Sequence, residues 1–295
     1  MKKELAPLLT PVLDRLDSLL ERAEQLLPQA APAPDWQAAL AYRWHSRAER
    51  GWLQPLTRTD NIRLADLIGI DRQKRAVNDN VRQFMAGLPA NNILLWGSRG
   101  TGKSSLLKAL LNEYSDAGLR LIEIDRRDLI QLPDILRMID DRPEKFLLFC
   151  DDLSFETGDV GYKQLKVVLD GSLTVSLDNL LVCATSNRRH LMPEPHSDNL
   201  ASQHDNGEIH FAEGIDERIA LSDRFGLWLA FHPFNQQEYL AIVQHWLSHY
   251  GCGEQIEQAR EQALRWALTR GSRSGRTAQQ FARDWAGSRA LSHSS

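Results

Sequence analysis

The sequence feature that most limits what this chain can fold into is a short glycine-rich stretch, GSRGTGKS, at residues 97–104. It fits the pattern G-x-x-x-x-G-K-[ST] of a phosphate-binding loop, whose backbone N–H groups point into one concavity. The apolar run at residues 93–96 predicts a buried strand before the loop, and residues 105–111 predict a helix after it. Because the motif lies between a strand and a helix, we expect it to bind phosphate rather than form an ordinary glycine turn.

The residue types in this loop predict how a nucleotide is held. Lys103 reaches the outer phosphates, and the hydroxyl of Ser104 is a ligand for Mg²⁺. The glycines permit the backbone angles of a cradle, and the start of the next helix adds partial positive charge. The expected phosphate contacts are Gly97, Ser98, Arg99, Gly100, Thr101, Gly102, Lys103, Ser104 and Ser105.

Four further apolar runs predict strands that alternate with helical segments, at residues 119–124, 146–150, 180–184 and 227–231. Short apolar strands alternating with helices are typical of a parallel sheet covered on both faces. We therefore expect an α/β fold of the P-loop class, with a five-stranded parallel sheet. Ligands of such sheets bind at the carboxyl ends of the strands, so the polar residues ending three of these strands are expected to converge on one site.

Helical patterns are expected on both sides of the sheet region. Residues 8–27 carry apolar positions at helical spacing, and this helix either packs on its own core or binds a partner. Asp35 is expected to cap a second helix that carries Trp36 and Trp44. After the sheet, Asn235 and a glutamate three residues later have the pattern of a capping box that opens a helical segment.

These patterns divide the chain into three expected parts. They are an N-terminal helical segment with a Pro/Ala linker (1–55), a nucleotide-binding α/β domain (56–234) and a helical lid (235–295). The formal net charge of −4 gives no general attraction to nucleic acid or anionic membranes. The sequence has no signal-peptide pattern and no run near the about 18 apolar residues of a spanning helix. We expect a soluble cytoplasmic protein with no membrane partner, and its 3 cysteines form no CxxC pair.

The strand at residues 146–150 ends on two carboxylates and has the form of a Walker B strand. Asp151 is expected to hold Mg²⁺, directly or through water. Asp152 is placed to orient or deprotonate the attacking water, and it is one methylene shorter than the glutamate usual at that place. Glu156 is the competing candidate for this base.

Taken together, these motifs resemble those of AAA+ ATPases, and within that superfamily the chain is similar to a bacterial family labelled domain of unknown function 815. The resemblance extends over about residues 36–285, including Tyr42, Arg43 and Trp44. Besides the phosphate loop, it is carried by residues 67–73 (LIGIDRQ), 150–156 (CDDLSFE), 184–191 (ATSNRRHL) and 221–227 (LSDRFGL).

The resemblance implies that the nucleotide is ATP, held with Mg²⁺. It places Ile68 and Gly69 against the adenine, through backbone and apolar contacts. Asn187 falls where AAA+ proteins keep the sensor-1 residue, which hydrogen-bonds the γ-phosphate or the lytic water.

The resemblance also implies roles for two arginines. Arg224 falls where the arginine finger lies, which reaches the nucleotide bound by a neighbouring subunit, so a homo-oligomer is implied. Arg218 is the alternative finger. Arg276 falls at the sensor-2 position of the lid, where it would contact the phosphates, and Arg273 competes for this role.

Three functions remain open at this stage. The first is an ATPase that couples hydrolysis to remodelling of an unidentified protein or complex. The second is a nucleic-acid-associated ATPase akin to helicase loaders, suggested by Arg188 and Arg189 but disfavoured by the acidic balance. The third is a nucleotide-gated switch with weak hydrolysis, suggested by Asp152 at the place of the usual glutamate.

Two stretches fit this scheme less well. Residues 192–215 form a long polar run rich in Asp, Asn and His, whose spacing matches no metal-site pattern, so we expect a solvated loop. Residues 158–163 (GDVGYK) either present Tyr162 and Lys163 to a bound substrate or simply lead into the next helix.

Overall fold

The computed structural model of the chain describes residues 15, 34–47, 50–57, 60–155, 159–170, 178–187, 191 and 221–293. Its contacts divide the chain into two units, Met1–Pro34 and Asp35–Ser295, and the second unit carries all that follows. The helix expected over residues 8–27 lies outside the described residues apart from Arg15, which is helical and exposed. The polar run at residues 192–215 also lies outside them.

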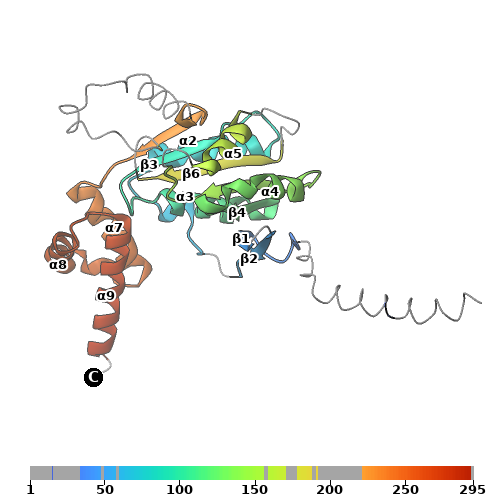
Figure 1. Cartoon of the computed structure of the whole chain (residues 1–295). Helices are drawn as coiled ribbons and strands as arrows, with labels where there is room; N and C mark the ends of the chain where they lie inside the picture. The colour runs from blue at the N-terminus through green and yellow to red at the C-terminus, as the bar shows by residue number, and fades with distance from the viewer. Residues whose placement is uncertain are drawn as a thin grey trace, which may run out of the picture. The chain divides into compact units, whose positions relative to one another are not determined.

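The second unit is built around a seven-stranded sheet with the strand order β2-β1-β4-β5-β6-β3-β7 (Figure 1). Neighbouring strands are parallel except β1 and β2, which are antiparallel. The five strands expected from the sequence are confirmed as β3 to β7. The strands are β1 Ala41–Arg47, β2 Arg50–Pro55, β3 Ile93–Gly97, β4 Leu119–Glu123, β5 Lys145–Cys150, β6 Leu180–Ser186 and β7 Leu227–Phe231.

Strands β1 and β2 correct the prediction for the N-terminal side of the sheet. The helix expected from Asp35 through Trp44 is wrong, because residues from Ala41 pair in parallel with β4 and in antiparallel with β2. The sheet therefore has two strands more than expected. The expected helical segment 1–55 likewise loses its last part to the sheet.

The side chains of β1 explain why the strand forms. Tyr42 and Trp44 are buried, whereas Arg43 between them is exposed and lies 2.6 Å from Glu123 of β4. Alternation of buried and exposed residues is the signature of a strand, and aromatic residues suit a half-buried pleated surface. The helical spacing of Trp36 and Trp44 was therefore misleading, because Tyr42 and Trp44 share one face of a strand.

Side chains of the central strands alternate between two hydrophobic clusters, one on each face of the sheet. In β3, Ile93 and Leu95 join the first cluster and Leu94 joins the second. Helices α2 (Asp71–Met85) and α3 (Lys103–Tyr114) bury their apolar faces in the first cluster. Helices α4 (Leu132–Ile139) and α5 (Val160–Leu169) bury theirs in the second. The expected three-layer α/β architecture is confirmed.

One side chain considered as a substrate contact is placed inside this second cluster. Tyr162 of α5 is buried, and its ring packs edge-on against Phe155 with 5.7 Å between ring centroids. Residues 159–163 therefore lead into a helix instead of presenting this aromatic ring to solvent, and Asp159 caps that helix by accepting a hydrogen bond from the Gly161 N–H.

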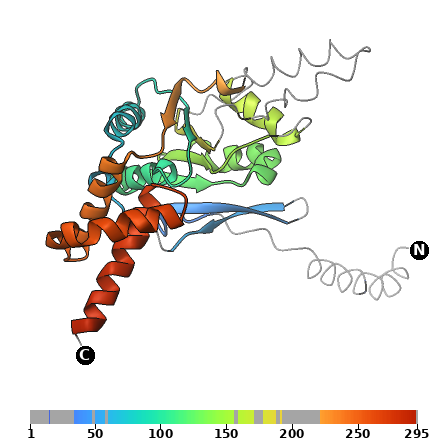
Figure 2. The ribbon, with the colours of Figure 1, turned by 90° about the vertical axis from the view of Figure 1, so that its left-hand side faces the viewer.

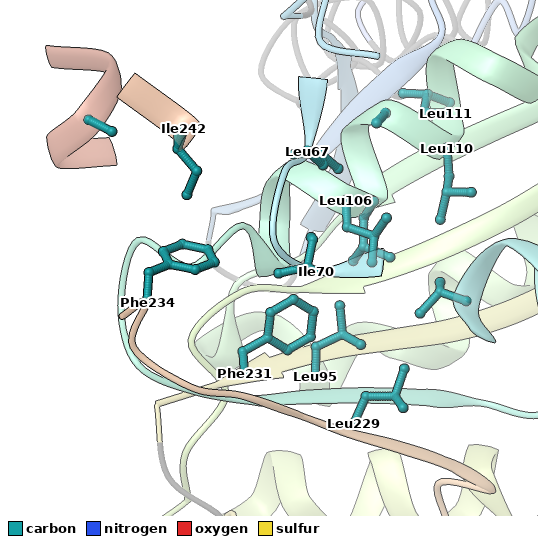
Figure 3. Packing of buried hydrophobic residues seen from close by; sticks show 14 of the residues in the cluster. Leu67, Ile70, Leu95, Leu106, Leu110, Leu111, Leu229, Phe231, Phe234 and Ile242 are labelled. Atoms are coloured by element: carbon teal, nitrogen blue, oxygen red, sulfur yellow. The ribbon is translucent and has the colours of Figure 1, made fainter. Parts of the chain in front are cut away.

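Three helices follow the sheet and group together in Figures 1 and 2: α7 (Gln236–His249), α8 (Ile256–Thr269) and α9 (Gly275–His293). The expected capping box is present, since the Asn235 N–H donates to Glu238 at 2.8 Å and the Glu238 N–H donates to Asn235 at 2.9 Å. The first cluster continues from β7 through Phe234 to Ile242 of α7 (Figure 3). The short 3₁₀ helices are η1 Leu64–Asp66, η2 Ser115–Ala117, η3 Arg126–Gln131 and η5 Gly253–Gln255.

No helix within the described parts of the chain combines the length and the apolar character needed to cross a membrane.

Candidate nucleotide-binding site

The glycine-rich loop joins β3 to α3, and its glycines take up the backbone angles that the motif requires. Gly97, Gly100 and Gly102 have φ angles of 126°, 74° and 100°, a region that other residues rarely adopt. A Cβ atom on Gly97 would also lie 2.0 Å from the carbonyl oxygen of Phe231 on the neighbouring strand β7. Both the angles and the close approach therefore require glycine here.

Lys103 is the first residue of α3, and its ammonium group is folded back into the loop. Its Nζ donates to the carbonyl oxygens of Gly97 and Ser98, at 2.7 Å each, and the residue is 7% exposed. Burial lowers the pKa of Lys103, while the nearby Asp151 and Asp152 carboxylates act in the opposite direction. A phosphate that entered the loop would offer this ammonium charged oxygens in place of neutral carbonyls.

The carboxylate of Asp151 faces the loop from the end of β5. The hydroxyl of Ser104 donates to its Oδ1 at 2.8 Å, and the hydroxyl of Thr185 on β6 donates to the same oxygen at 2.5 Å. Mg²⁺ prefers hydroxyl and carboxylate oxygens, and here one of each kind lies side by side next to the cradle. The residues present therefore fit a magnesium ion shared by Ser104 and Asp151.

Asp152 is held in an unusual conformation beside this pair. Its φ angle is 51°, which is uncommon outside glycine, and such backbone strain clusters at functional sites. Asn187 Nδ2 donates to one carboxylate oxygen of Asp152, and Arg99 Nη2 lies 3.4 Å from the other. The carboxylate is 57% exposed and thus open to solvent. Glu156, the competing base, lies outside the described residues.

These groups line one cavity of about 520 Å³ that lies between the loop, the strand ends and the helices α7 and α9. Its size is that of a small-molecule site. Helix α9 closes one side, because the Gly275 N–H at its start donates to the Gly100 carbonyl at 2.9 Å. Of the residues expected from the sequence, those that line the cavity are Ile68, Arg99, Gly100, Thr101, Gly102, Lys103, Ser104, Ser105, Asp151, Asp152, Asn187 and Arg276.

Three residues that were expected to contact the nucleotide do not line this cavity: Gly69, Gly97 and Ser98. The carbonyl groups of Gly97 and Ser98 accept hydrogen bonds from the Lys103 ammonium instead. Gly69 follows the lining residue Ile68 and has a φ angle of 80°. Of the two arginines proposed for sensor 2, Arg276 lines the cavity, whereas Arg273 lines a second hollow next to the loop.

Arg224, the expected arginine finger, does not line the cavity of its own chain. Its Nε donates to Asp170 at the end of α5, and its side chain is 24% exposed. Arg224 therefore forms an intrachain salt bridge with Asp170. The alternative finger Arg218 and the basic pair Arg188 and Arg189 lie outside the described residues.

The structure adds cavity residues that the sequence reasoning did not single out. Thr185 on β6 contacts the Walker B carboxylate, and Ile242 and Trp246 of α7 form an apolar wall with Leu67 and Phe234. Thr185 could have been predicted, because it carries a hydroxyl near the end of a strand, two residues before Asn187. Trp246 gave no such signal, because its position depends on how α7 packs against α9 and lies beside Asp66.

Comparison with known proteins gives a family match over most of the chain. The profile of the family described as "Protein of unknown function (DUF815)" matches residues 37–289, from the segment before β1 into α9. The chaperone protein ClpB of Rhodopirellula baltica is 24% identical over 213 residues, which are 60% of this chain and 24% of that protein. ClpB of Leptolyngbya boryana is 26% identical over 165 residues, 46% of this chain and 19% of that protein. The chain thus spans 24% or less of the length of these relatives.

Solved structures with a related backbone were also found. The RuvB Holliday junction branch migration motor of Thermotoga maritima has 14% identity and a TM-score of 0.42, over 75% of this chain and 71% of that one. A DNA replication initiation factor has 20% identity and a TM-score of 0.44, over 68% of this chain and 59% of that one.

Proposed function

The chain belongs to the DUF815 family and has the AAA+ P-loop fold, and we propose that it binds ATP with Mg²⁺ and hydrolyses it to remodel a bound protein or complex. The observation that carries this proposal is the single cavity. It brings together a phosphate cradle, two adjacent acidic residues, the Asn187 amide and the lid arginine Arg276, which come from four separate parts of the chain.

In this proposal the triphosphate lies in the loop. The Lys103 ammonium exchanges the carbonyl oxygens of Gly97 and Ser98 for phosphate oxygens, and the backbone N–H groups of the cradle bind the rest. Held by Ser104 and Asp151, Mg²⁺ would supply positive charge to the oxygens of the outer phosphates. Arg276 would reach the same end of the nucleotide from α9, since it lines the cavity and its backbone N–H lies 3.4 Å from the Gly100 carbonyl oxygen of the loop.

The base of the nucleotide has an apolar wall to pack against. Leu67 and Ile68 form one side of it, and Ile242 and Trp246 of α7 form the other. Aromatic side chains stack well on nucleobases. Because one side of this wall belongs to the sheet region and the other to the lid, ATP would join the two. Its cleavage would then loosen α7–α9, which is the movement that we propose drives remodelling.

Asp152 is the proposed general base. Its carboxylate oxygen beside Arg99 would accept the proton of the attacking water, while the Asn187 amide orients the other oxygen and the water. Asp152 has a left-handed backbone conformation and lines the cavity. Arg99 must release the carboxylate before it can act as a base.

We further propose that the ATPase works as a homo-oligomer. Arg224 would leave Asp170 and reach the ATP of an adjacent subunit, where it would stabilise the charge of the transition state. The support is that Arg224 is partly exposed and lies outside the cavity of its own chain.

Binding and turnover of ATP by the purified chain test the proposal. Wild type is expected to bind ATP more tightly with Mg²⁺ than with a chelator and to release phosphate. Asp152→Asn keeps the shape of the side chain, so it should bind ATP like wild type but release phosphate at least about a hundredfold more slowly. Turnover of Asp152→Asn at the wild-type rate would contradict its role as the base.

A nucleotide-gated switch with weak hydrolysis is the second candidate function. The observation that favours it is the ion pair of Asp152 with Arg99, which occupies one oxygen of the proposed base. If the switch is correct, wild type turns over slowly and Asp152→Glu, which restores the longer side chain, is faster. If Asp152→Glu is slower than wild type, the aspartate is already the working base.

A further inference from the structure

Thr185 is a buried polar residue at the end of β6, and its hydroxyl lies between the two acidic residues of the site. The residue is 1% exposed. Strands β5 and β6 are paired here, with Cys150 opposite Ala184, so Thr185 lies beside the turn that follows β5. A hydroxyl buried at such a place needs partners, and those that it has are all part of the proposed catalytic turn.

Three hydrogen bonds tie the turn to this one residue. The Thr185 hydroxyl donates to Asp151 Oδ1 at 2.5 Å and accepts the backbone N–H of Asp152 at 2.9 Å. Its carbonyl accepts the N–H of Leu153 at 2.7 Å. The first two bonds fix the direction of the hydroxyl, because it carries one proton and that proton points to Asp151.

The hydrogen bond from Thr185 to Asp151 bears on how this carboxylate would bind Mg²⁺. Oδ1 of Asp151 receives the protons of both Thr185 and Ser104, which fixes the rotation of the carboxylate. Ligands that are held by outer hydrogen bonds bind metals more tightly, because less freedom is lost on binding. The effect on Asp152 concerns the base, since the bond to its N–H helps to hold the backbone at its φ angle of 51°.

We propose that Thr185 is a positioning residue that sets the Asp151 carboxylate for Mg²⁺ and the Asp152 turn for attack on the nucleotide. This inference rests on the proposed function, because it assumes that Mg²⁺ and ATP bind here. It goes further, because it states that one hydroxyl on the neighbouring strand positions both acidic residues.

The test compares Thr185→Val with Thr185→Ser. Valine keeps the shape but removes the hydroxyl, whereas serine keeps the hydroxyl and loses a methyl group. The readout is the affinity for ATP in a chelator and then across a magnesium titration, which does not depend on turnover. We expect Thr185→Val to bind ATP in chelator within about twofold of wild type, since the loop is intact, and to need about tenfold more Mg²⁺. Thr185→Ser should stay close to wild type in both its ATP affinity in chelator and its magnesium requirement.

The outcomes separate this inference from the proposed function. If wild type shows no binding of ATP that Mg²⁺ strengthens, the proposed function fails and the inference falls with it. If wild type shows it and Thr185→Val has the same magnesium requirement, only the inference is overturned. An equal loss of affinity with and without Mg²⁺, or failure of Thr185→Ser to rescue, would mean that the residue merely supports the fold. Should Thr185→Val not fold, Thr185→Ala gives the same comparison with serine.

Discussion

The phosphate end of the cavity and the surface around Arg224 differ in how complete they are within one chain. At the phosphate end, Lys103, Asp151 and Asp152 are all held by hydrogen bonds and charges from the same chain, and all line one cavity. Arg224 lies outside that cavity and pairs with Asp170. Under the proposed function, a single chain would bind nucleotide by itself, whereas fast cleavage would need a second copy.

Replacing Arg224 is the strongest way to test this contrast. Arg224→Ala should lower the maximal rate of ATP hydrolysis by about a thousandfold, the lower end of what arginine fingers contribute, and should leave ATP affinity unchanged. Phosphate release and equilibrium binding measure the two quantities. The control is Arg273→Ala, which removes an arginine from a separate hollow and should change neither by more than about twofold. A finger variant with normal turnover would show that Arg224 is only an intrachain partner.

Replacing Lys103 tests whether the phosphate end of the cavity is complete within one chain. Lys103→Ala removes the buried ammonium that the loop carbonyls now hold, so ATP affinity should fall by about a hundredfold or more. The fall should be the same at every protein concentration, because this end of the site is complete in one chain. A loss that depended on protein concentration would mean that a neighbour contributes to binding as well.

The apolar wall offers a smaller effect with a sharp control. Trp246→Ala should weaken ATP binding about tenfold, as expected for loss of one aromatic contact with a base. Inorganic tripolyphosphate has no base, so its affinity should not change. Equal weakening of both ligands would show that Trp246 acts through the lid as a whole and not through the base.

The pairing of Arg224 with Asp170 predicts a still smaller change. Asp170→Asn keeps the size of the side chain and removes the charge of one partner of Arg224, so turnover at low protein concentration should rise by up to about fivefold. ATP affinity should not move. A fall in turnover would indicate that Asp170 orients Arg224 for its task instead of restraining it.

The smallest predicted effect is one of pH. Because burial lowers the pKa of Lys103, the free protein loses this positive charge at a lower pH than an ordinary lysine does. Bound phosphates favour the charged form, so ATP affinity is full below the lowered pKa and falls as pH rises through it. Binding in that alkaline range should take up a proton, which calorimetry in buffers of different ionisation enthalpy detects. Lys103→Arg keeps its charge, so proton uptake there would assign the effect to another group.

The parts of the fold that the sequence predicted are those with a local pattern. Strands β3 to β7 are short apolar runs. The capping box formed by Asn235 and Glu238, which are three residues apart, marks the start of α7. The loop residues gather because the motif is contiguous and because parallel strands end at the same edge. Strand β1 was missed because Trp36 and Trp44 imitate a helical spacing, while the strand pattern was carried by Tyr42 and its neighbours.

The parts of the site that the sequence did not predict depend on contacts between distant segments. The role of Thr185 follows from the pairing of β5 with β6, which places it beside a turn that lies 34 residues earlier in the chain. Trp246 lines the cavity because α7 packs against α9 and lies beside Asp66 of η1, a contact that no local pattern predicts. Asp170, one partner of Arg224, is 54 residues away, and no spacing rule identifies it.

Mixing two inactive variants tests most directly whether one copy completes the site of another. Lys103→Ala has an intact Arg224 but no phosphate site, and Arg224→Ala has an intact phosphate site but no finger. Each alone should fail to release phosphate. The account predicts that an equal mixture regains a substantial part of wild-type turnover, because Arg224 of one copy then serves the ATP bound by the other. A mixture as inactive as its two components would contradict it.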